Sequence, residues 1–241
     1  MKKIWIVASR ELKSYFDSLM AYIMIVLFLA FSGFFTWIST SNVFVTGQAS
    51  LRQFFAIAYW TLFFFIPAVT MRQISEEKRS GTIELILTKP LTDWQFVAGK
   101  FLSSLILIGI TLALTLPYYF TVWSLGPVDH GEVWTGYLGL LLMSSAYIAI
   151  GIMCSSFTKN QIEAFLLSIF IGIFFHLISK LIAMNMKGII GRILDYVSVQ
   201  THFESISRGV IDTKDIIYFV SMVFVCLFIS ESILAKRNYG K

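Results

Sequence analysis

Charged side chains are scarce in this sequence. Asp, Glu, Lys and Arg make up 14% of the 241 residues, whereas a soluble globular domain carries roughly 25%. Hydrophobic residues account for 57%, and the mean hydropathy is +0.77. This balance excludes an ordinary soluble domain and indicates a chain whose solvent is largely lipid. The net charge is +5, but the charged residues cluster between the apolar runs and form no basic stripe, so no nucleic-acid partner is expected.

Cysteines and catalytic motifs are also few. Cys154 and Cys226 both lie inside apolar runs, which indicates small buried core residues rather than a disulfide framework or a metal site. The sequence contains no phosphate-binding loop of the form Gly-x-x-x-x-Gly-Lys-Ser/Thr and no His-Glu-x-x-His metal helix. We therefore expect the chain to bind no nucleotide, cofactor or metal of its own and not to be an enzyme.

Long apolar runs dominate what is present. A bilayer core about 30 Å thick needs roughly 20 apolar residues in a helix, and six stretches meet that length. The sequence thus predicts an all-α membrane protein with six transmembrane helices in one domain, residues 1–241. The predicted spans are about Leu19–Trp37, Phe54–Met71, Phe101–Trp123, Trp134–Phe157, Ile162–Ala183 and Ile216–Leu234. Thirteen of the nineteen Lys and Arg residues fall on the side of the two termini, which the positive-inside rule places in the cytoplasm.

Two segments outside the spans have amphipathic patterns. Residues 1–18 place apolar side chains at helical spacing with basic residues opposite, as in a helix lying on the membrane surface; the alternative is a solvated extension of the first span. Residues 184–215 begin with a second interfacial or re-entrant helix. Thr201 and Glu204 then have the spacing of a capping box for a short helix that ends near Gly209, and Asp212 or Thr213 would cap the last span.

The outer segment, residues 184–215, also holds the polar candidates His202, Glu204 and Arg208. A histidine with Ser205 nearby suggests a hydrolase, but no nucleophile elbow or orienting carboxylate stands out. Met184 and Met186 offer two thioethers, which suit Cu(I), although two methionines without a third partner favour packing. An intramembrane enzyme or assembly factor that uses the segment around His202 remains an alternative function.

The polar stretch "ISEEKRSGTIELILTKPL", residues 74–91, interrupts the apolar pattern after the second span. That span is expected to continue as a charged helix until Gly81 ends it. Thr82 would then cap a short helix, Ile83–Leu87, that Pro90 stops, and "TDWQ" would cap the helix that leads into the third span. We call residues 72–100 the elbow. Its apolar tip can be covered either by lipid headgroups or by a protein partner.

The stretch "EEKRSGTIELILTKPLTDWQFVAGKF" resembles the cytoplasmic segment of ABC exporter permeases of the type-two class, where a Glu-rich turn, Gly-Thr-aliphatic-Glu and then Pro lead into the third span. More narrowly, "RELKSYFDSLMAYI" and "HFESISRGVIDTKDIIYFVSM" are similar to the gliding-motility-associated ABC permease subunit (GldF) family. This resemblance implies a bacterial inner-membrane permease that is driven by a separate ATPase subunit, and this ATPase would bind ATP and Mg. The permease would pair with a second copy of itself or with a homologous permease, and an auxiliary subunit is possible. The elbow would be its coupling helix. The implied coupling residues are Glu76, Glu77, Lys78, Arg79, Gly81, Thr82, Ile83, Glu84, Ile86 and Pro90.

Two further expectations concern the cargo and the work done. Ionisable groups are rare inside the spans, and this fits an amphipathic, lipid-like or glycan-lipid substrate better than a small ion. A motility-linked complex can also use the strokes of an ATPase for mechanical work without transport. The sequence therefore leaves a transporting permease and a mechanical membrane subunit as alternatives.

Overall fold

The computed structural model describes residues 2–39, 43–83, 91–186 and 188–236. Within these ranges, six helical segments are long and apolar enough to cross a membrane, which confirms the predicted all-α fold with six spans. The segments are Leu19–Trp37, Arg52–Ser80, Asp93–Leu125, His130–Phe157, Gln161–Asn185 and Thr213–Lys236.

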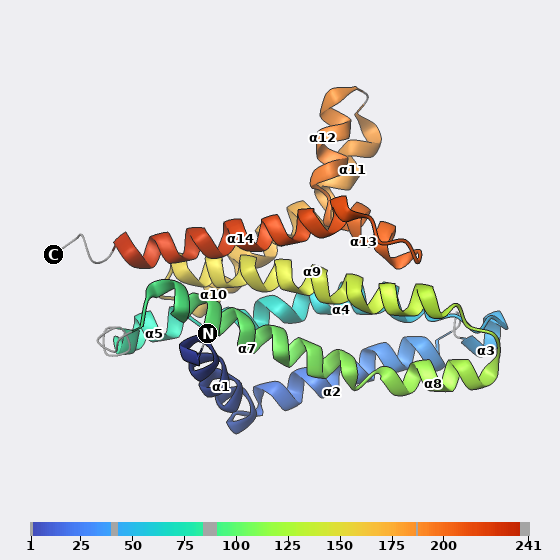
Figure 1. The fold of residues 1–241 in the computed structure, drawn as a ribbon, viewed down its shortest axis with the longest axis horizontal. Helices are drawn as coiled ribbons and strands as arrows, with labels where there is room; N and C mark the ends of the chain where they lie inside the picture. Colours follow the sequence, from blue (N-terminus) through green and yellow to red (C-terminus); the bar gives the residue numbers. More distant parts are fainter. Residues whose placement is uncertain (1, 40–42, 84–90, 187, 237–241) are drawn as a thin grey trace.

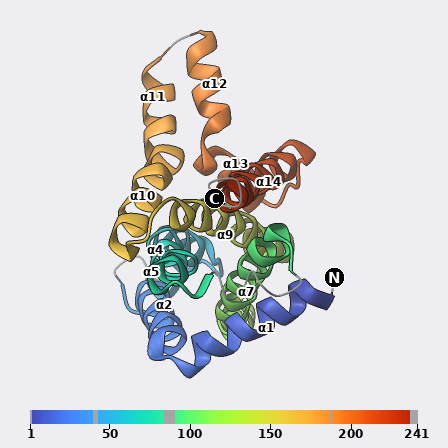
Figure 2. The ribbon, with the colours of Figure 1, turned by 90° about the vertical axis from the view of Figure 1, so that its left-hand side faces the viewer.

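The spans lie side by side along the long axis of the molecule (Figure 1). We call the end that carries α5 (Ser75–Ser80) and the end of α14 (Thr213–Lys236) the proximal end. The opposite, distal end carries α3 (Val43–Thr46) and α13 (Val199–Ser207). Seen from the proximal end, α9 (His130–Phe157) lies among the other spans (Figure 2) and is almost entirely buried. By contrast α2 (Leu19–Trp37) exposes most of its apolar surface, as a span in contact with lipid would.

Glycines let α9 approach α4 (Arg52–Thr70) closely. A Cβ added at Gly136 would lie 2.5 Å from the Phe55 ring, and one at Gly151 would lie 1.9 Å from Thr70 Oγ1. The two contacts are 15 residues apart on each helix, so α4 and α9 run in the same direction with a constant register. At 1.5 Å per residue, the contact spans about 22 Å of the bundle.

The predicted N-terminal amphipathic helix is present as α1 (Lys2–Asp17). Its apolar residues Val7, Ala8 and Tyr15 are buried, and the helix crosses beside α7 (Asp93–Ala113) at the proximal end (Figure 2). Part of the face that the sequence assigns to the membrane surface therefore packs against the protein, while Trp5 on another face stays exposed.

The second span does not continue as one helix into the elbow, contrary to the prediction. A turn over residues 71–74 separates α4 from α5. The hydroxyl of Ser155 on α9 stabilises this turn, because it donates to the carbonyl of Met71 at 2.9 Å and accepts from the amides of Ile74 and Ser75 at 3.1 and 3.0 Å. One buried side chain thus satisfies backbone groups that the interrupted helix leaves without helical partners.

The third span is also interrupted. It consists of α7 and α8 (Leu116–Leu125), and the break precedes Pro117, which lacks the amide hydrogen that a continuous helix would use. The expected cap at its start is present: Thr92 and Gln95 form a capping box.

The fifth span, predicted at about Ile162–Ala183, changes direction within its length. It comprises α10 (Gln161–Ile173), a π-helical turn (η1, Phe174–Ile178) and α11 (Ser179–Asn185). Beyond the turn, α11 and α12 (Ile189–Val197) form a hairpin that stands away from the bundle (Figures 1 and 2). His176 in the turn is buried, and its ring stacks on Tyr59 and Phe63 with centroids 4.1 and 4.3 Å away. These tertiary contacts favour the turn, and no local sequence signal marks it.

Only one of the two predicted caps in the outer segment is present. Asp212 caps the last span, since its carboxylate accepts from the amide of Lys214 at 3.1 Å. Thr201, by contrast, lies inside α13, which begins at Val199, and its hydroxyl donates to Asp195. The predicted capping box is therefore wrong. The carboxylate of Glu204 instead contacts the side chains of Gln200 and Lys180. The helix nevertheless ends close to Gly209, as expected.

Candidate functional site

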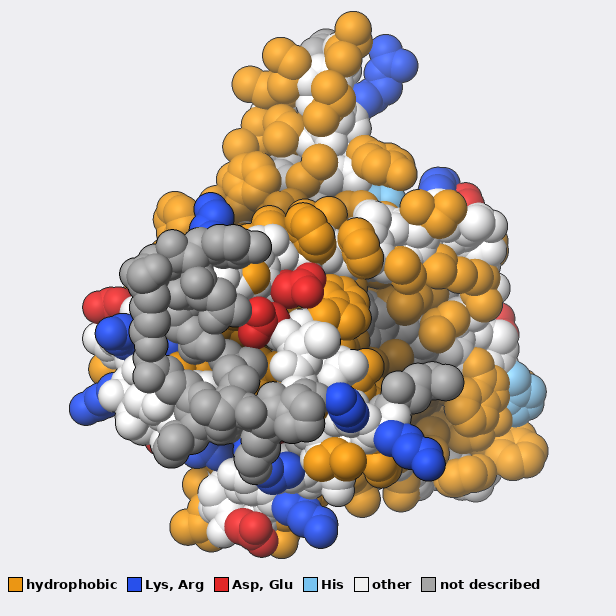
Figure 3. Space-filling model, turned by 60° about the vertical axis from the view of Figure 1, so that its left-hand side comes forward, with side chains coloured by type: hydrophobic (Ala, Val, Ile, Leu, Met, Phe, Trp, Pro, Cys, Tyr) orange, Lys and Arg blue, Asp and Glu red, His pale blue; other side chains and the backbone are white. Residues whose placement is uncertain are grey.

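The first candidate site is the described part of the elbow at the proximal end. Figure 3 shows acidic and basic side chains gathered there, with hydrophobic side chains over the flanks. Glu76, Arg79, Gly81 and Thr82 are exposed. Gly81 ends α5 with φ of 73°, a left-handed conformation that glycine adopts without the steric cost of a Cβ. The predicted break at Gly81 is confirmed.

The other predicted coupling residues divide into two groups. Glu84, Ile86 and Pro90 lie outside the described residues. Ile83 is 4% exposed, and Lys78 donates to the backbone carbonyl of Ser156 on α9. Of the predicted coupling residues that the structure describes, Glu76, Arg79 and Thr82 combine exposure with charge or hydrogen-bonding capacity at the tip.

Buried polar side chains fix the base of the elbow to α1 and α7. Gln73, in the turn before α5, donates through Nε2 to the hydroxyl of Tyr15 on α1 at 2.5 Å and to the hydroxyl of Ser104 on α7. Tyr15 and Ser104 also lie 3.2 Å apart, within hydrogen-bonding distance. Arg72 reaches back to Ser18, just after α1, at 3.2 Å. The turn is therefore tied to three helices, α1, α7 and α9.

A charge cluster adds a second connection among the same elements. Lys100 on α7 is 1% exposed, and its Nζ lies 2.9 Å from Glu77 Oε1 on α5 and 3.3 Å from Glu11 Oε2 on α1. Arg10 contacts the same carboxylates, at 2.7 Å from Glu11 and 3.4 Å from Glu77. Two carboxylates thus compensate the buried ammonium and link the elbow to α1.

The charge state of Glu11 follows from this environment. Burial favours the neutral acid, but the positive charges of Lys100 and Arg10 outweigh burial and lower the pKa of Glu11 below its usual value. The sequence analysis identified Glu77 but missed its partners Lys100 and Arg10, and Glu11 as the second carboxylate of the cluster. The available signal was Lys100 itself, a charge next to the apolar run that begins at Phe101.

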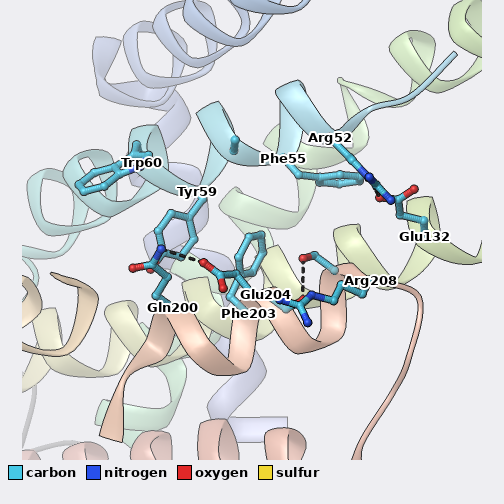
Figure 4. A pocket seen from close by; sticks show the side chains of 11 residues that line it. Arg52, Phe55, Tyr59, Trp60, Glu132, Gln200, Phe203, Glu204 and Arg208 are labelled. Carbon is cyan, nitrogen blue, oxygen red and sulfur yellow. Dashed lines mark hydrogen bonds and ion pairs between the residues drawn. The ribbon is translucent and has the colours of Figure 1, made fainter. Parts of the chain in front are cut away.

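The second candidate site is a pocket of about 480 Å³ at the distal end, between α4, α9 and α13 (Figure 4). At one edge Arg52 of α4 forms an ion pair with Glu132 of α9. Four aromatic side chains, Phe55, Tyr59, Trp60 and Phe203, form one wall of the pocket, and the rings of Tyr59 and Phe203 stack with centroids 4.8 Å apart. The pocket is lined by Arg52, Phe55, Ala56, Tyr59, Trp60, Glu132, Gln200, Phe203, Glu204, Ser207 and Arg208.

The structure places two of the three outer candidates, Glu204 and Arg208, at this pocket. Glu204 accepts from Gln200 at 2.8 Å and forms an ion pair with Lys180 of α11 at 2.6 Å. Arg208 is exposed, and its guanidinium makes no ion pair with any described residue.

His202, the third candidate, is buried elsewhere. Its Nδ1 lies 2.6 Å from Asp215 Oδ1 on α14, and its Nε2 donates to the carbonyl of Tyr196 at 2.8 Å. Asp215 is the orienting carboxylate that the sequence analysis did not find. A catalytic base needs one free ring nitrogen that faces its nucleophile, and both nitrogens of His202 already have protein partners. The pair therefore clamps α13 to α14 and does not support the hydrolase alternative.

Metal and thiol chemistry have no assembled site in the described ranges. No group of three or more His, Cys, Asp or Glu side chains there could hold a metal ion. Cys154 and Cys226 are free and buried, as predicted. Met184 and Met186 are 77% and 48% exposed on the projecting hairpin.

Comparison with known proteins gives the family. Residues 35–234 match the family described as ABC-2 family transporter protein. The chain is also 26% identical over 101 residues to the "Probable multidrug ABC transporter permease YbhR" of Escherichia coli strain K12, and equally to that of Escherichia coli O157:H7. These alignments cover 42% of this chain and only 27% of each relative. The family match covers most of the chain, and the protein therefore belongs to the ABC-2 family transporter proteins, a family of ABC transporter permeases.

Proposed function

We propose that this chain is the transmembrane subunit through which a separate ATPase subunit drives substrate across the bacterial inner membrane. The observation that carries the proposal is the construction of the elbow. Its exposed tip presents Glu76, Arg79 and Thr82, while its base is held on α1, α7 and α9 by Gln73, Lys100 and Ser155. Mechanical coupling needs a segment whose tip can contact a partner and whose base is fixed to the spans, so that a displacement of the tip moves the spans.

The roles of the predicted coupling residues follow from this geometry. Glu76, Arg79 and Thr82 would contact the ATPase, and Gly81 would set the direction of the chain at the tip. Glu77 and Lys78, which bind within the chain, would transmit the displacement to α7 and α9. Glu84, Ile86 and Pro90 would complete the docking surface, as the family resemblance implies.

The proposal also includes an orientation and an assembly. The excess of Lys and Arg at the proximal end favours a cytoplasmic location for the elbow and both termini. ATP and Mg would bind to the partner, and a second permease, identical or homologous, would complete the pathway, with a possible auxiliary subunit. A role in gliding motility rests on the resemblance of the motifs alone.

The test is co-expression with candidate ATPase subunits, purification of the complex and measurement of ATP hydrolysis. Arg79→Glu reverses a charge at the tip, and Arg192→Glu makes the same change on the distal hairpin as a matched control. We expect Arg79→Glu to reduce the amount of co-purified ATPase at least tenfold, while Arg192→Glu retains it. If an ATPase binds both variants equally, the elbow is not its docking site.

A further inference from the structure

We infer that the distal pocket binds an amphiphile with an anionic headgroup, with the headgroup at Arg208 and the chain along α4. This inference rests on the proposed function, since it names the class of molecule that the permease would handle. Three features of the structure support it: the pairing of the charges around the pocket, the aromatic wall, and an apolar groove that continues from this wall.

Among the described residues, the charges of the pocket leave one cation, Arg208, outside any ion pair. Arg52 is paired with Glu132, and Glu204 is paired with Lys180. Arg208 lines the same pocket and, within the described part of the chain, forms no ion pair. A guanidinium is suited to a phosphate or carboxylate because its donors match two oxygens at once.

The same pairing argues against a cationic ligand. Trp60, the exposed aromatic side chain of the pocket, offers a ring of the kind that binds ammonium groups. However, both carboxylates that could neutralise such a group, Glu132 and Glu204, already bind protein cations. A cation would have to displace an ion pair, whereas an anion meets Arg208 without displacing one.

The aromatic wall continues into an apolar groove. Trp60 lines both the pocket and a second cavity of about 270 Å³ between α2 and α4. That cavity is lined by Phe31, Phe35, Ile57, Trp60, Thr61, Phe64 and Phe65. Ala56, Trp60 and Phe64 lie four residues apart and are all exposed, so they form an apolar stripe along α4.

Size and shape then select an amphiphile over a small anion. The pocket of about 480 Å³ lies within the usual range of about 300–1,000 Å³ for ligand sites. It can hold a headgroup and the start of a chain, and the rest of a long chain would lie past Trp60 in the groove. A free phosphate would fill the Arg208 end but leave the aromatic wall uncovered.

The experiment uses the full chain in phosphatidylcholine bilayers without an ATPase, with Trp60 as the reporter. Dibrominated phosphatidylglycerol or dibrominated phosphatidylcholine is added at increasing mole fraction. The quenching of Trp60 is the difference between the protein and its Trp60→Phe variant. We expect half-quenching at about a fivefold lower mole fraction of the anionic lipid.

The variants assign the preference to one side chain. Arg208→Gln should abolish it and Arg208→Lys should retain it, while Arg192→Gln, which removes a charge from α12 outside the pocket, should leave it intact. Equal quenching by both lipids, or a preference that survives Arg208→Gln, would overturn the inference. If Arg208→Gln fails to fold, glycerol 3-phosphate added to the wild type provides the test: it competes with the headgroup at Arg208 and should weaken the preference, and a preference that it leaves unchanged would overturn the inference. No ATPase enters the assay, so its result is independent of whether the elbow docks one.

Discussion

Replacing Lys100 with methionine is the sharpest test of how the elbow is anchored. The substitution keeps the length and apolar stem of the side chain but removes a charge that is 1% exposed and lies within 3.3 Å of two carboxylates. Removing one member of a buried ion pair costs roughly 3–5 kcal/mol, because the other member keeps its desolvation penalty.

The expected loss here is smaller than that range. Glu77 and Glu11 are 14% and 16% exposed, and both keep a contact with Arg10. Partial hydration and this remaining cation compensate part of the charge, so we expect Lys100→Met to lower the free energy of unfolding by about 2–3 kcal/mol. The measurement is unfolding by SDS titration in mixed micelles, followed by circular dichroism.

Two further variants separate the cluster from a general packing effect. Lys13→Met changes the same residue type at an exposed position of α1 and should cost less than about 0.5 kcal/mol. The triple variant Lys100→Met, Glu11→Gln, Glu77→Gln removes the three buried or half-buried charges and should recover at least half of the loss, because the charge that stays unpaired, Arg10, is 49% exposed and solvated. A loss below about 0.5 kcal/mol for Lys100→Met, or no recovery in the triple variant, would refute the reasoning.

Three other predictions concern the same end of the molecule. Ser155→Ala should destabilise the turn at residues 71–74 by about 1–3 kcal/mol and speed hydrogen exchange of the Ile74 and Ser75 amides. Ser156→Ala is the control, because the Ser156 hydroxyl donates to Met153 of its own helix at 2.6 Å. Equal exchange rates in the two variants would contradict the role assigned to Ser155. Gly151→Ala should cost about 1–3 kcal/mol in the same SDS titration, because its Cβ would lie 2.8 Å from Thr70 Cβ, whereas Gly109→Ala, with nothing within 4 Å, should be neutral or stabilising. The pKa of Glu11 lies below its unfolded value of about 4.5, so the contribution of Glu11 to stability is complete above that value and is lost as the pH falls through the folded pKa. Glu11→Gln should therefore flatten the decline in stability below about pH 5. An unchanged dependence of stability on pH would count against the contact between Glu11 and Lys100.

Local pattern was enough to predict the spans and several caps. The apolar runs specify six helices because a bilayer imposes their length, and Thr92, Gly81 and Asp212 act within a few residues of their own positions. Such features depend on neighbours in the chain, which a sequence displays directly.

The contacts that form the two sites could not be predicted in the same way. Lys100 and Glu11 are 89 residues apart, and Arg52 and Glu132 are 80 apart; only the packing of the helices brings them together. The same holds for the π-helical turn at His176, which depends on Tyr59 and Phe63 of another span. Thr201 and Glu204 show the converse, since a matching local pattern was overridden by Lys180 and Asp195.

The two candidate sites share α4 and α9, and this limits how a displacement at one can reach the other. Ser155 holds the proximal end of the pair and the Arg52–Glu132 ion pair holds the distal end, with the glycine contacts at Gly136 and Gly151 between them. Two helices packed this closely are expected to move as one body.

In the proposed mechanism the change of shape must then occur around α4 and α9. The break between α7 and α8 and the π-helical turn at His176 are the interruptions of the neighbouring spans, and the turn packs on Tyr59, which also lines the distal pocket. Because α10 of the fifth span contacts α5, displacement of the elbow would reach the pocket through the bend of the fifth span rather than through bending of α4.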